Sequence, residues 1–258
     1  MIHADLELAR RLEAGEAAIA RACSEGRPGT AILEAAGGIA VFAGAESPLT
    51  QAVGIGLHGP VPRAEIDRLE SFFRRRGAQV NIDLCPLADP GLLEQLAARG
   101  YRPAEFNNVM VMRLASAEIS PPVRARCTLP DEAELWCQTV GLGYFEQPEL
   151  SEEEMDVGRA ICSMPGAHCY LAFADGGEAC AGGALAVRQG LATLFADSTM
   201  ARYRRRGSQR DLISARLSEA LARGCDLATA TVSPGSASQR NYERAGFQVA
   251  YTKILLVA

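Results

Sequence analysis

The segment RYRRRGSQRDL, at residues 202–212, combines residue types that can bind an anion. It lies between a predicted strand and a predicted helix, where free backbone N–H groups and the positive end of the helix dipole meet. Arginine side chains add charge-assisted hydrogen bonds, so the predicted ligand is a phosphate or a pyrophosphate. Arginine-rich turns are also common as solvated surface, and the segment alone leaves both interpretations open.

A second RRRG tetrapeptide occurs at residues 74–77. Its arginines follow the amphipathic segment AEIDRLESFF, in which Ile66, Leu69 and Phe73 form an apolar stripe. They are therefore predicted to form the last turn of a helix that Gly77 ends. Cations are favourable at that end of a helix, and no ligand is needed to explain them. The two identical tetrapeptides are thus expected at opposite ends of equivalent helices.

The apolar periodicity of the second half indicates a mixed sheet with helices on both faces. The strands HCYLAFA and ACAGGALAV are joined by DGG, which is typical of a hairpin, and a later strand, helix and strand imply a parallel crossover. The predicted fold class is therefore α/β, with a mixed sheet of the α+β kind. The predicted strands are 123–128, 168–174, 179–187, 191–198, 226–232 and 248–257, and the predicted helices are 131–141, 151–163, 209–223 and 236–245.

The two halves of the chain repeat one order of elements. Residues 96–111 align with residues 242–257, and AEIDRLESFFRRRG aligns with DLISARLSEALARG. A diproline at residues 121–122 interrupts the apolar pattern between the copies. We therefore predict a tandem duplication. The predicted domains are residues 1–117 and residues 118–258.

The composition argues against several classes of function. The formal net charge is −5, which opposes a nucleic-acid-binding surface. The eight cysteines include no CxxC pair and the three histidines are far apart, so we predict free thiols, no metal site and a reducing, cytoplasmic location. No apolar run reaches the roughly 20 residues of a membrane span, and no membrane partner is expected.

Two motifs in their order along the chain resemble the GCN5-related N-acetyltransferase (GNAT) superfamily. RRRGSQ follows a strand at residues 204–209, and YERAGF ends a helix at residues 242–247. The resemblance implies an acyl-CoA N-acyltransferase fold, acetyl-CoA as co-substrate, a pyrophosphate on the arginine loop, and a pantetheine arm paired with the preceding strand. Two residues depart from the family pattern. The family usually has Gly or Ala at the position of Gln209, and many members have Asn at the position of Gly235. The cofactor-binding residues that the resemblance implies are Asp197, Ser198, Thr199, Arg204, Arg205, Arg206, Gly207, Ser208, Gln209, Arg210 and Asn241.

The resemblance also implies that Tyr242 donates a proton to the departing thiolate; the alternative is a tyrosine that only packs near the helix end. A base is needed because an alkyl-ammonium acceptor must lose a proton before it attacks. Asp197, at the end of LATLFADST, and Glu146, in GLGYFEQPEL, are candidates by position, and a water chain without a dedicated base is left open. We rank Asp197 first, although an Asp at a strand end can simply cap backbone groups.

The first half lacks this chemistry at the corresponding positions. Pro60 aligns with Gly207, and Leu96 aligns with Tyr242. Proline has no N–H to offer an anion and cannot adopt the backbone of a glycine turn. The first domain is therefore predicted to be a degenerate GNAT-like domain that supports the catalytic domain or shapes the acceptor site.

The sequence thus predicts an N-acetyltransferase that transfers an acetyl group to an amine by direct attack in a ternary complex. The acceptor is a small-molecule amine or a peptide, and a homodimer is left open. The alternative is a catalytically silent CoA-binding sensor or accessory module, and the acidic net charge opposes an RNA-binding domain. We interpret SEEE, at residues 151–154, as a capping box rather than as a site for cationic substrates, because Ser151 and Glu154 have that spacing.

Overall fold

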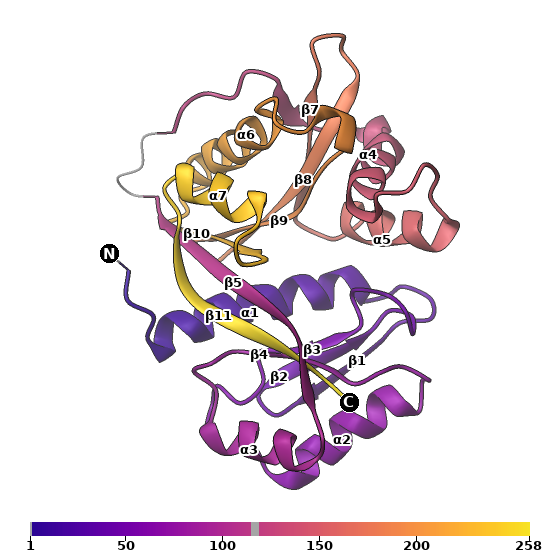
Figure 1. Cartoon of the computed structure of the whole chain (residues 1–258), viewed down its shortest axis with the longest axis vertical. Helices are drawn as coiled ribbons and strands as arrows, with labels where there is room; N and C mark the ends of the chain where they lie inside the picture. Colours follow the sequence, from indigo (N-terminus) through magenta and orange to yellow (C-terminus); the bar gives the residue numbers. More distant parts are fainter. Residues whose placement is uncertain (1, 115–118) are drawn as a thin grey trace. The chain divides into compact units, whose positions relative to one another are not determined.

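The computed structural model describes residues 2–114 and 119–258, which form two compact units (Figure 1). Unit 1 comprises Met1–Val109, Val232–Pro234 and Val249–Ala258, and unit 2 comprises Met110–Thr231 and Gly235–Gln248. The predicted boundary after residue 117 lies outside the described residues. Residues Val249–Ala258 belong to unit 1, whereas a division into 1–117 and 118–258 places them in the second domain.

Unit 1 is a sheet whose strands follow the order β1-β2-β3-β4-β11-β5. Strands β3 and β4 are parallel and are joined through α2. The pairs β1–β2, β2–β3 and β4–β11 are antiparallel. Figure 1 shows α1, α2 and α3 around these strands. The elements are α1 (Leu6–Ser24), β1 (Ala31–Ala35), β2 (Gly38–Phe42), β3 (Gln51–Val53), α2 (Arg63–Arg74), β4 (Asn81–Leu84), α3 (Pro90–Ala98), β5 (Arg102–Arg113) and β11 (Gln248–Val257).

Unit 2 repeats this plan with the strand order β5-β10-β9-β8-β7-β6. Strands β9 and β10 are parallel across α6, and the meander from β6 to β9 is antiparallel. The predicted mixed α/β fold is confirmed, and most element ends lie within two residues of their predicted positions. The elements are β6 (Ala125–Cys127), α4 (Ala133–Phe145), α5 (Glu152–Cys162), β7 (Ala167–Phe173), β8 (Ala179–Arg188), β9 (Leu191–Thr199), α6 (Ser208–Ala222), β10 (Leu227–Val232) and α7 (Ala237–Arg244).

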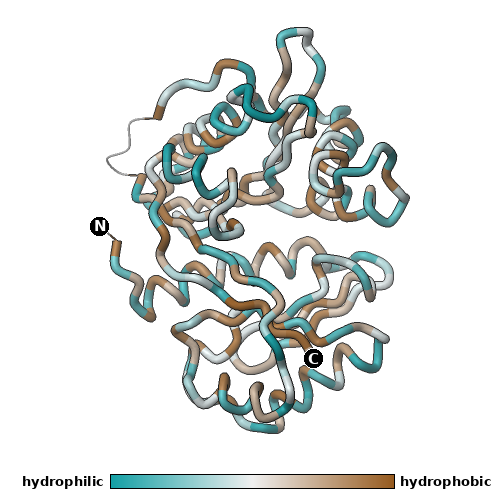
Figure 2. The backbone as a smooth tube through the Cα atoms, in the orientation of Figure 1, coloured by the Kyte–Doolittle hydropathy of each residue, from teal (hydrophilic) through white to brown (hydrophobic). Residues whose placement is uncertain are grey.

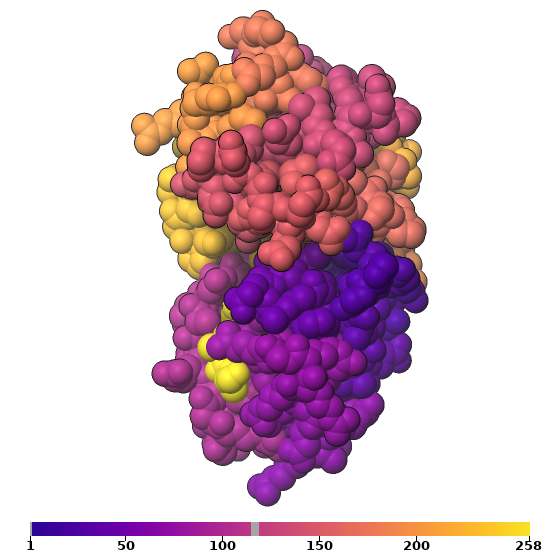
Figure 3. All heavy atoms as spheres, turned by 90° about the vertical axis from the view of Figure 1, so that its right-hand side faces the viewer, coloured from indigo at the N-terminus to yellow at the C-terminus, as the bar shows by residue number. Residues whose placement is uncertain are grey.

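The last strand of each half lies beside a strand of the other half. Strand β11 follows α7 in the sequence but pairs with β4, with Leu255 opposite Asp83. The end of β5 lies beside β10, where Thr229 Oγ1 donates to the Met110 carbonyl at 3.0 Å. Figure 3 shows yellow C-terminal atoms among the violet atoms of unit 1. Periodicity predicted both strands correctly, but it carries no information on which partner each strand selects.

The two RRRG tetrapeptides lie at opposite ends of equivalent helices, as predicted. Helix α2 ends at Arg74, and Gly77 follows in the left-handed conformation with a φ of 69°. Helix α6 begins at Ser208, directly after Gly207, which has a φ of 88°. The helix before the first tetrapeptide is slightly shorter than predicted, because residues 75–77 form a turn rather than further helix.

The core of unit 1 contains a buried group of charges, which we call the Lys253 cluster. Lys253 Nζ lies 2.5 Å from Asp83 Oδ2, 2.7 Å from Glu16 Oε2 and 3.3 Å from Glu13 Oε2. The Tyr251 hydroxyl donates to Glu13 Oε1 at 2.8 Å. Burial raises the pKa of Glu13 to about 7 and that of Asp83 to about 6. Burial acts to lower the pKa of Lys253, but the carboxylates outweigh it and raise that pKa well above its ordinary value. Three carboxyl groups thus share one ammonium.

No helix among the described residues is long and apolar enough to cross a membrane. The 19-residue α1 is the longest helix among them, and its buried residues include both Leu12 and the charged Glu13. Figure 2 shows hydrophobic and hydrophilic residues alternating along this helix. Its hydrophobic positions cover a sheet, as expected for an amphipathic helix.

Candidate active site

Strand β9 carries a β-bulge next to its C-terminal end. The pairing register shifts between Gly182 and Ala184 on β8, so that Gly183 lies opposite two residues of β9. One of these, Ala196, has a left-handed φ of 54°, and the other is Asp197. A bulge locally bends the strand and redirects a side chain, and here the redirected side chain is the carboxylate that the sequence analysis ranked first as the base.

Asp197 is held between two fully buried side chains. The Arg216 guanidinium on α6 forms an ion pair with Asp197 Oδ1, and the Tyr242 hydroxyl on α7 donates to Asp197 Oδ2. Arg216 also donates to the Leu212 carbonyl at 3.0 Å and to the Ala184 carbonyl at 3.1 Å. Arg216 and Tyr242 are completely buried, whereas 13% of the Asp197 side chain is exposed. The three side chains therefore form a buried triad with the carboxylate as its exposed member.

Electrostatics fix the protonation of two members of the triad. Burial, followed by the charge of Asp197, raises the pKa of Tyr242 well above its ordinary value, so the phenol stays neutral and donates. Burial acts to lower the pKa of Arg216, but the interactions with Asp197 and Tyr242 together outweigh it, and the net shift is upward. A buried guanidinium without a counter-ion would be strongly destabilising, so Arg216 needs the charge of Asp197.

Gly183 provides the space that this ion pair occupies. A Cβ atom at Gly183 would lie 2.6 Å from Asp197 Oδ1 and 2.7 Å from Arg216 Nη1. Real carbon contacts at such distances are essentially never seen. The Asp197–Arg216 pair therefore lies directly over a residue that has to be glycine.

An open cleft of about 1110 Å³ lies in unit 2 beside the triad. All eleven residues that the resemblance assigned to acetyl-CoA line it, including Asn241. Tyr242 does not line the cleft and lies behind Asp197. The lining residues are Gly143, Tyr144, Glu146, Asp197, Ser198, Thr199, Tyr203, Arg204, Arg205, Arg206, Gly207, Ser208, Gln209, Arg210, Ser236, Ala237, Ser238, Arg240, Asn241 and Arg244.

The start of α6 presents backbone donors to this cleft. No side chain caps the helix at Gly207, so the N–H groups of its first turn are not satisfied by a capping side chain. Arg205 precedes it with a left-handed φ of 65°, which completes a tight turn. Free N–H groups and the helix dipole at this point favour an anion.

The arginines of the loop differ in what they contact. Arg204 is engaged, since it donates to Glu146 Oε1 at 2.6 Å and to the Thr199 carbonyl at 3.2 Å. Arg206 lies over the Tyr203 ring at 5.6 Å. Glu146 was the second candidate base, and its ion pair with Arg204 gives it a structural role at the rim of the cleft. The cations of the loop outnumber its acidic partners, so an anion would balance them.

Besides Asp197 Oδ1, which is paired with Arg216, two buried polar atoms of the cleft lining have no hydrogen-bond partner within the described residues. They are Gln209 Nε2, a donor, and the Ser198 hydroxyl, which can donate or accept. Unsatisfied buried polar atoms are costly, and a ligand with acceptor oxygens would satisfy both. The residues present therefore fit a pyrophosphate followed by an amide-containing arm. Gln209 supplies a donor at the position where it departs from the family pattern.

The capping box predicted at residues 151–154 is confirmed. Ser151 Oγ accepts from the Glu154 N–H at 3.2 Å, and Glu154 Oε2 accepts from the Ser151 N–H at 2.8 Å. Tyr144 lines the cleft and is 61% exposed. Within the described residues, no group of three His, Cys, Asp or Glu side chains has the arrangement of a metal site.

Sequence reasoning missed Arg216 and Gly183. Arg216 lies one turn after Leu212 in the buried face of α6, where an arginine interrupts an otherwise apolar stripe. An arginine at a buried position needs a carboxylate partner, and that requirement was the available signal. Gly183 belongs to a Gly-Gly pair inside a predicted strand, which is typical of a bulge or a close approach.

Comparison with known proteins identifies the fold of the chain. No family model and no curated protein sequence matches the chain. A GCN5-related N-acetyltransferase from Kribbella flavida matches with a TM-score of 0.70 and 18% identity, covering 97% of this chain and 95% of that one. A GCN5-related N-acetyltransferase from Sphaerobacter thermophilus matches with a TM-score of 0.60 and 17% identity, covering 89% and 75%. The chain thus has the GCN5-related N-acetyltransferase fold.

The fold is present in its tandem form. A tandem GNAT protein from the clavulanic acid biosynthesis pathway matches with a TM-score of 0.63 and 15% identity, and the match covers 100% of this chain and 96% of that one. The tandem GNAT fold that the repeated sequence predicts is therefore confirmed over the length of the chain.

Proposed function

We propose that the protein is an acetyl-CoA-dependent N-acetyltransferase whose active site lies in unit 2. The observation that carries this proposal is the cleft in which the bulged end of β9, the uncapped start of α6 and the arginine loop meet. Acetyl-CoA supplies an activated acetyl group as a thioester. The N–H groups of Gly207, Ser208 and Gln209 would hold its pyrophosphate, and the end of β9 would hold its pantetheine arm.

Asp197 is the group of the triad that meets the acceptor. Its partly exposed carboxylate takes a proton from the ammonium group of a primary amine, directly or through water, and leaves the nitrogen lone pair free to attack. When the new C–N bond forms and the C–S bond breaks, the nitrogen loses its second proton and the departing sulfur gains one. Holding both reactants in one cleft makes a large contribution, since it replaces a bimolecular encounter with an oriented one.

Tyr242 serves this chemistry through Asp197. Its hydroxyl is buried behind the carboxylate and donates to it, so a proton from Tyr242 reaches the cleft by way of Asp197. Tyr242 and Arg216 together orient the carboxylate from two sides. We therefore assign Tyr242 to proton relay and positioning, and Arg216 to positioning.

The test of the binding site compares the two RRRG tetrapeptides. Arg206→Ala combined with Gly207→Pro is expected to weaken acetyl-CoA binding beyond detection in calorimetry, because it removes a cation, an N–H donor and the left-handed turn. Arg75→Ala, in the tetrapeptide at the end of α2, is the matched control and is expected to bind like the parent protein. Circular dichroism checks that both variants are folded. Equal acetyl-CoA affinity in the parent and the double variant would refute the site.

A catalytically silent CoA-binding protein is the second candidate, and the complete burial of Tyr242 favours it. Release of free thiol from acetyl-CoA in the presence of spermidine, lysine, kanamycin or a lysine-containing peptide separates the two functions. Turnover with any of these amines supports the enzyme. Saturable acetyl-CoA binding without turnover on any of them supports the sensor.

A further inference from the structure

Three cysteine side chains of unit 2 meet between α4, α5 and β7, and we call them the thiol cluster. Cys162 Sγ, at the end of α5, lies 3.5 Å from Cys169 Sγ on β7 and 3.9 Å from Cys137 Sγ on α4. Cys162 is half-buried, whereas Cys137 and Cys169 are 2% and 7% exposed. The cluster thus has one thiol that solvent can reach and two buried thiols in contact with it.

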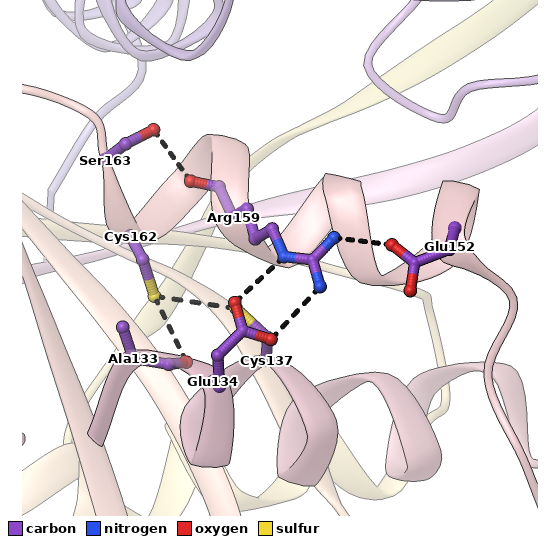
Figure 4. A network of polar contacts seen from close by, with 7 residues as sticks. All are labelled: Ala133, Glu134, Cys137, Glu152, Arg159, Cys162 and Ser163. Atoms are coloured by element: carbon purple, nitrogen blue, oxygen red, sulfur yellow. Dashed lines mark hydrogen bonds and ion pairs between the residues drawn. The ribbon is translucent and has the colours of Figure 1, made fainter. Parts of the chain in front are cut away.

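The packing of α5 against α4 holds the cluster together. A Cβ atom at Gly158 would lie 2.9 Å from Cys137 Sγ, so the two helices approach each other as closely as a glycine allows. Arg159 of α5 also donates to Glu134 of α4 at 2.9 Å and 3.1 Å (Figure 4). Figure 4 shows the Cys162 sulfur pointing toward Cys137 and the Ala133 carbonyl. The packing of α5 against α4 therefore determines where the sulfur atoms lie.

We propose that the thiol cluster is an oxidation site, at which a peroxide converts Cys162 and Cys169 into a reversible disulfide. The half-buried Cys162 sulfur attacks one peroxide oxygen, the O–O bond breaks, and Cys162 becomes a sulfenic acid while water leaves. The Cys169 sulfur then attacks the Cys162 sulfur, the S–O bond breaks, and a second water leaves. Overall, two thiols lose two electrons and two protons, and the peroxide is reduced to water.

The geometry suits the second step. The sulfur atoms already lie 3.5 Å apart, so they need to approach by about 1.5 Å to reach the length of a disulfide bond, about 2.05 Å. The link would join the end of α5 to the start of β7, two elements that are already neighbours. A dithiol such as dithiothreitol would reverse it by exchange.

The environment of Cys162 sets the rate of the first step. A hydrogen bond from Cys137 acts to lower the pKa of Cys162, but the contact with Cys169 and burial outweigh it and raise the pKa to about 12. The thiolate is the reactive form, so the rate of oxidation is expected to rise about tenfold per pH unit below that value.

Cys137 gives the cluster a second partner for Cys162. Because it lies 3.9 Å from Cys162 on the side of α4, it can resolve the sulfenic acid when Cys169 is absent. Cys169→Ser is therefore expected to divert the disulfide to Cys137–Cys162. This diversion distinguishes a built cluster from a chance contact of two thiols.

The test uses the full chain with Cys127→Ser, which removes the cysteine that the structure exposes to solvent. The protein is treated with hydrogen peroxide at pH 9, the remaining thiols are alkylated, and peptides are mapped by mass spectrometry. The expected result is a Cys162–Cys169 disulfide, the loss of two alkylated thiols, and their recovery after dithiothreitol. Retention of every thiol, or a disulfide that lacks Cys162, overturns the proposal.

Trapping of the intermediate provides a second measurement. In the Cys137→Ser, Cys169→Ser variant no partner remains, and dimedone is expected to label the sulfenic acid at Cys162. Labelling at another cysteine under the same conditions overturns the assignment of Cys162 as the attacked thiol. The peptide mapping of the main test leaves the three cysteines of the thiol cluster unchanged. It therefore stays valid if this double variant does not fold.

Discussion

The Lys253 cluster makes the stability of unit 1 depend on pH in an unusual direction. Glu13 has a pKa of about 7 in the folded unit, against a model value of 4.5. The folded state therefore binds more protons than the unfolded chain between these values, and the free energy of unfolding falls as the pH rises. One pKa unit corresponds to about 1.4 kcal/mol, so the proton on Glu13 contributes about 3 kcal/mol that is present below pH 4.5 and lost by pH 7.

Burial raises the pKa of Glu13, and it outweighs Lys253 and the Tyr251 hydroxyl, which act to lower that pKa. Glu16 and Asp83 are like charges, and the pKa of Asp83 is itself raised to about 6. Lys253 stays protonated throughout, because its pKa lies well above its ordinary value. Burial lowers the pKa of His168, which acts in the opposite direction but lies in unit 2. The measurement therefore has to be local to unit 1.

Hydrogen exchange of the β11 amides supplies such a measurement. After correction for the intrinsic exchange rate, their protection factors are expected to fall roughly a hundredfold between pH 5 and pH 8. Glu13→Gln, which imitates the protonated side chain, is expected to remove most of this dependence. Glu7→Gln, at an exposed position of the same helix, is the control and should retain it. Protection that does not change with pH, or a slope that is as steep in Glu13→Gln as in the parent protein, would refute the reasoning; a smaller slope from Asp83 is expected to remain.

Two further predictions concern the triad. Both are measured in assays that use an amine acceptor with which the parent protein gives turnover. Gly183→Ala forces a methyl group between Asp197 and Arg216, so we expect a destabilisation of about 1–3 kcal/mol from overpacking and a loss of turnover because the carboxylate is displaced. Gly176→Ala, where a Cβ meets nothing within 4 Å, is its control in steady-state kinetics. Tyr242→Phe leaves a carboxylate oxygen without its donor, so we expect at least a tenfold loss of turnover and a destabilisation of about 1–3 kcal/mol in urea titration. Parent-like turnover would contradict the relay.

Local sequence patterns predicted most elements of unit 2. The helix predicted at 209–223 is α6, Ser208–Ala222, and the strand predicted at 191–198 is β9, Leu191–Thr199. These elements follow from side-chain periodicity and glycine positions, which act within the chain segment itself. The bulge in β9 could not be predicted in this way, because it depends on the register with β8.

Features that depend on distant partners were not predicted. Nothing near β11 indicates that Lys253 would meet Glu13 and Glu16 across some 240 residues of sequence. The burial of Tyr242 behind Asp197 likewise requires α7, β9 and α6 to be placed in space. The motif identified the tyrosine, but only the three-dimensional arrangement shows that its hydroxyl lies behind a carboxylate and does not line the cleft.

The two halves differ in the groups that lie at the N-terminal ends of the equivalent helices α2 and α6. In unit 1, the N-cap of α2 is Pro62, and Glu65 lies in the first turn, where its carboxylate accepts from the Ala36 N–H at 2.9 Å and pairs with Arg68 at 2.6 Å. These hydrogen bonds hold the pKa of Glu65 below its usual value, so a negative charge of the chain itself already complements the helix dipole. In unit 2, α6 starts with a glycine, an uncapped turn and an excess of arginine. The start of α2 therefore lies beside a carboxylate that accepts from a backbone N–H of the same unit, whereas the start of α6 has no capping side chain, lines the cleft and carries the buried Asp211 in its first turn.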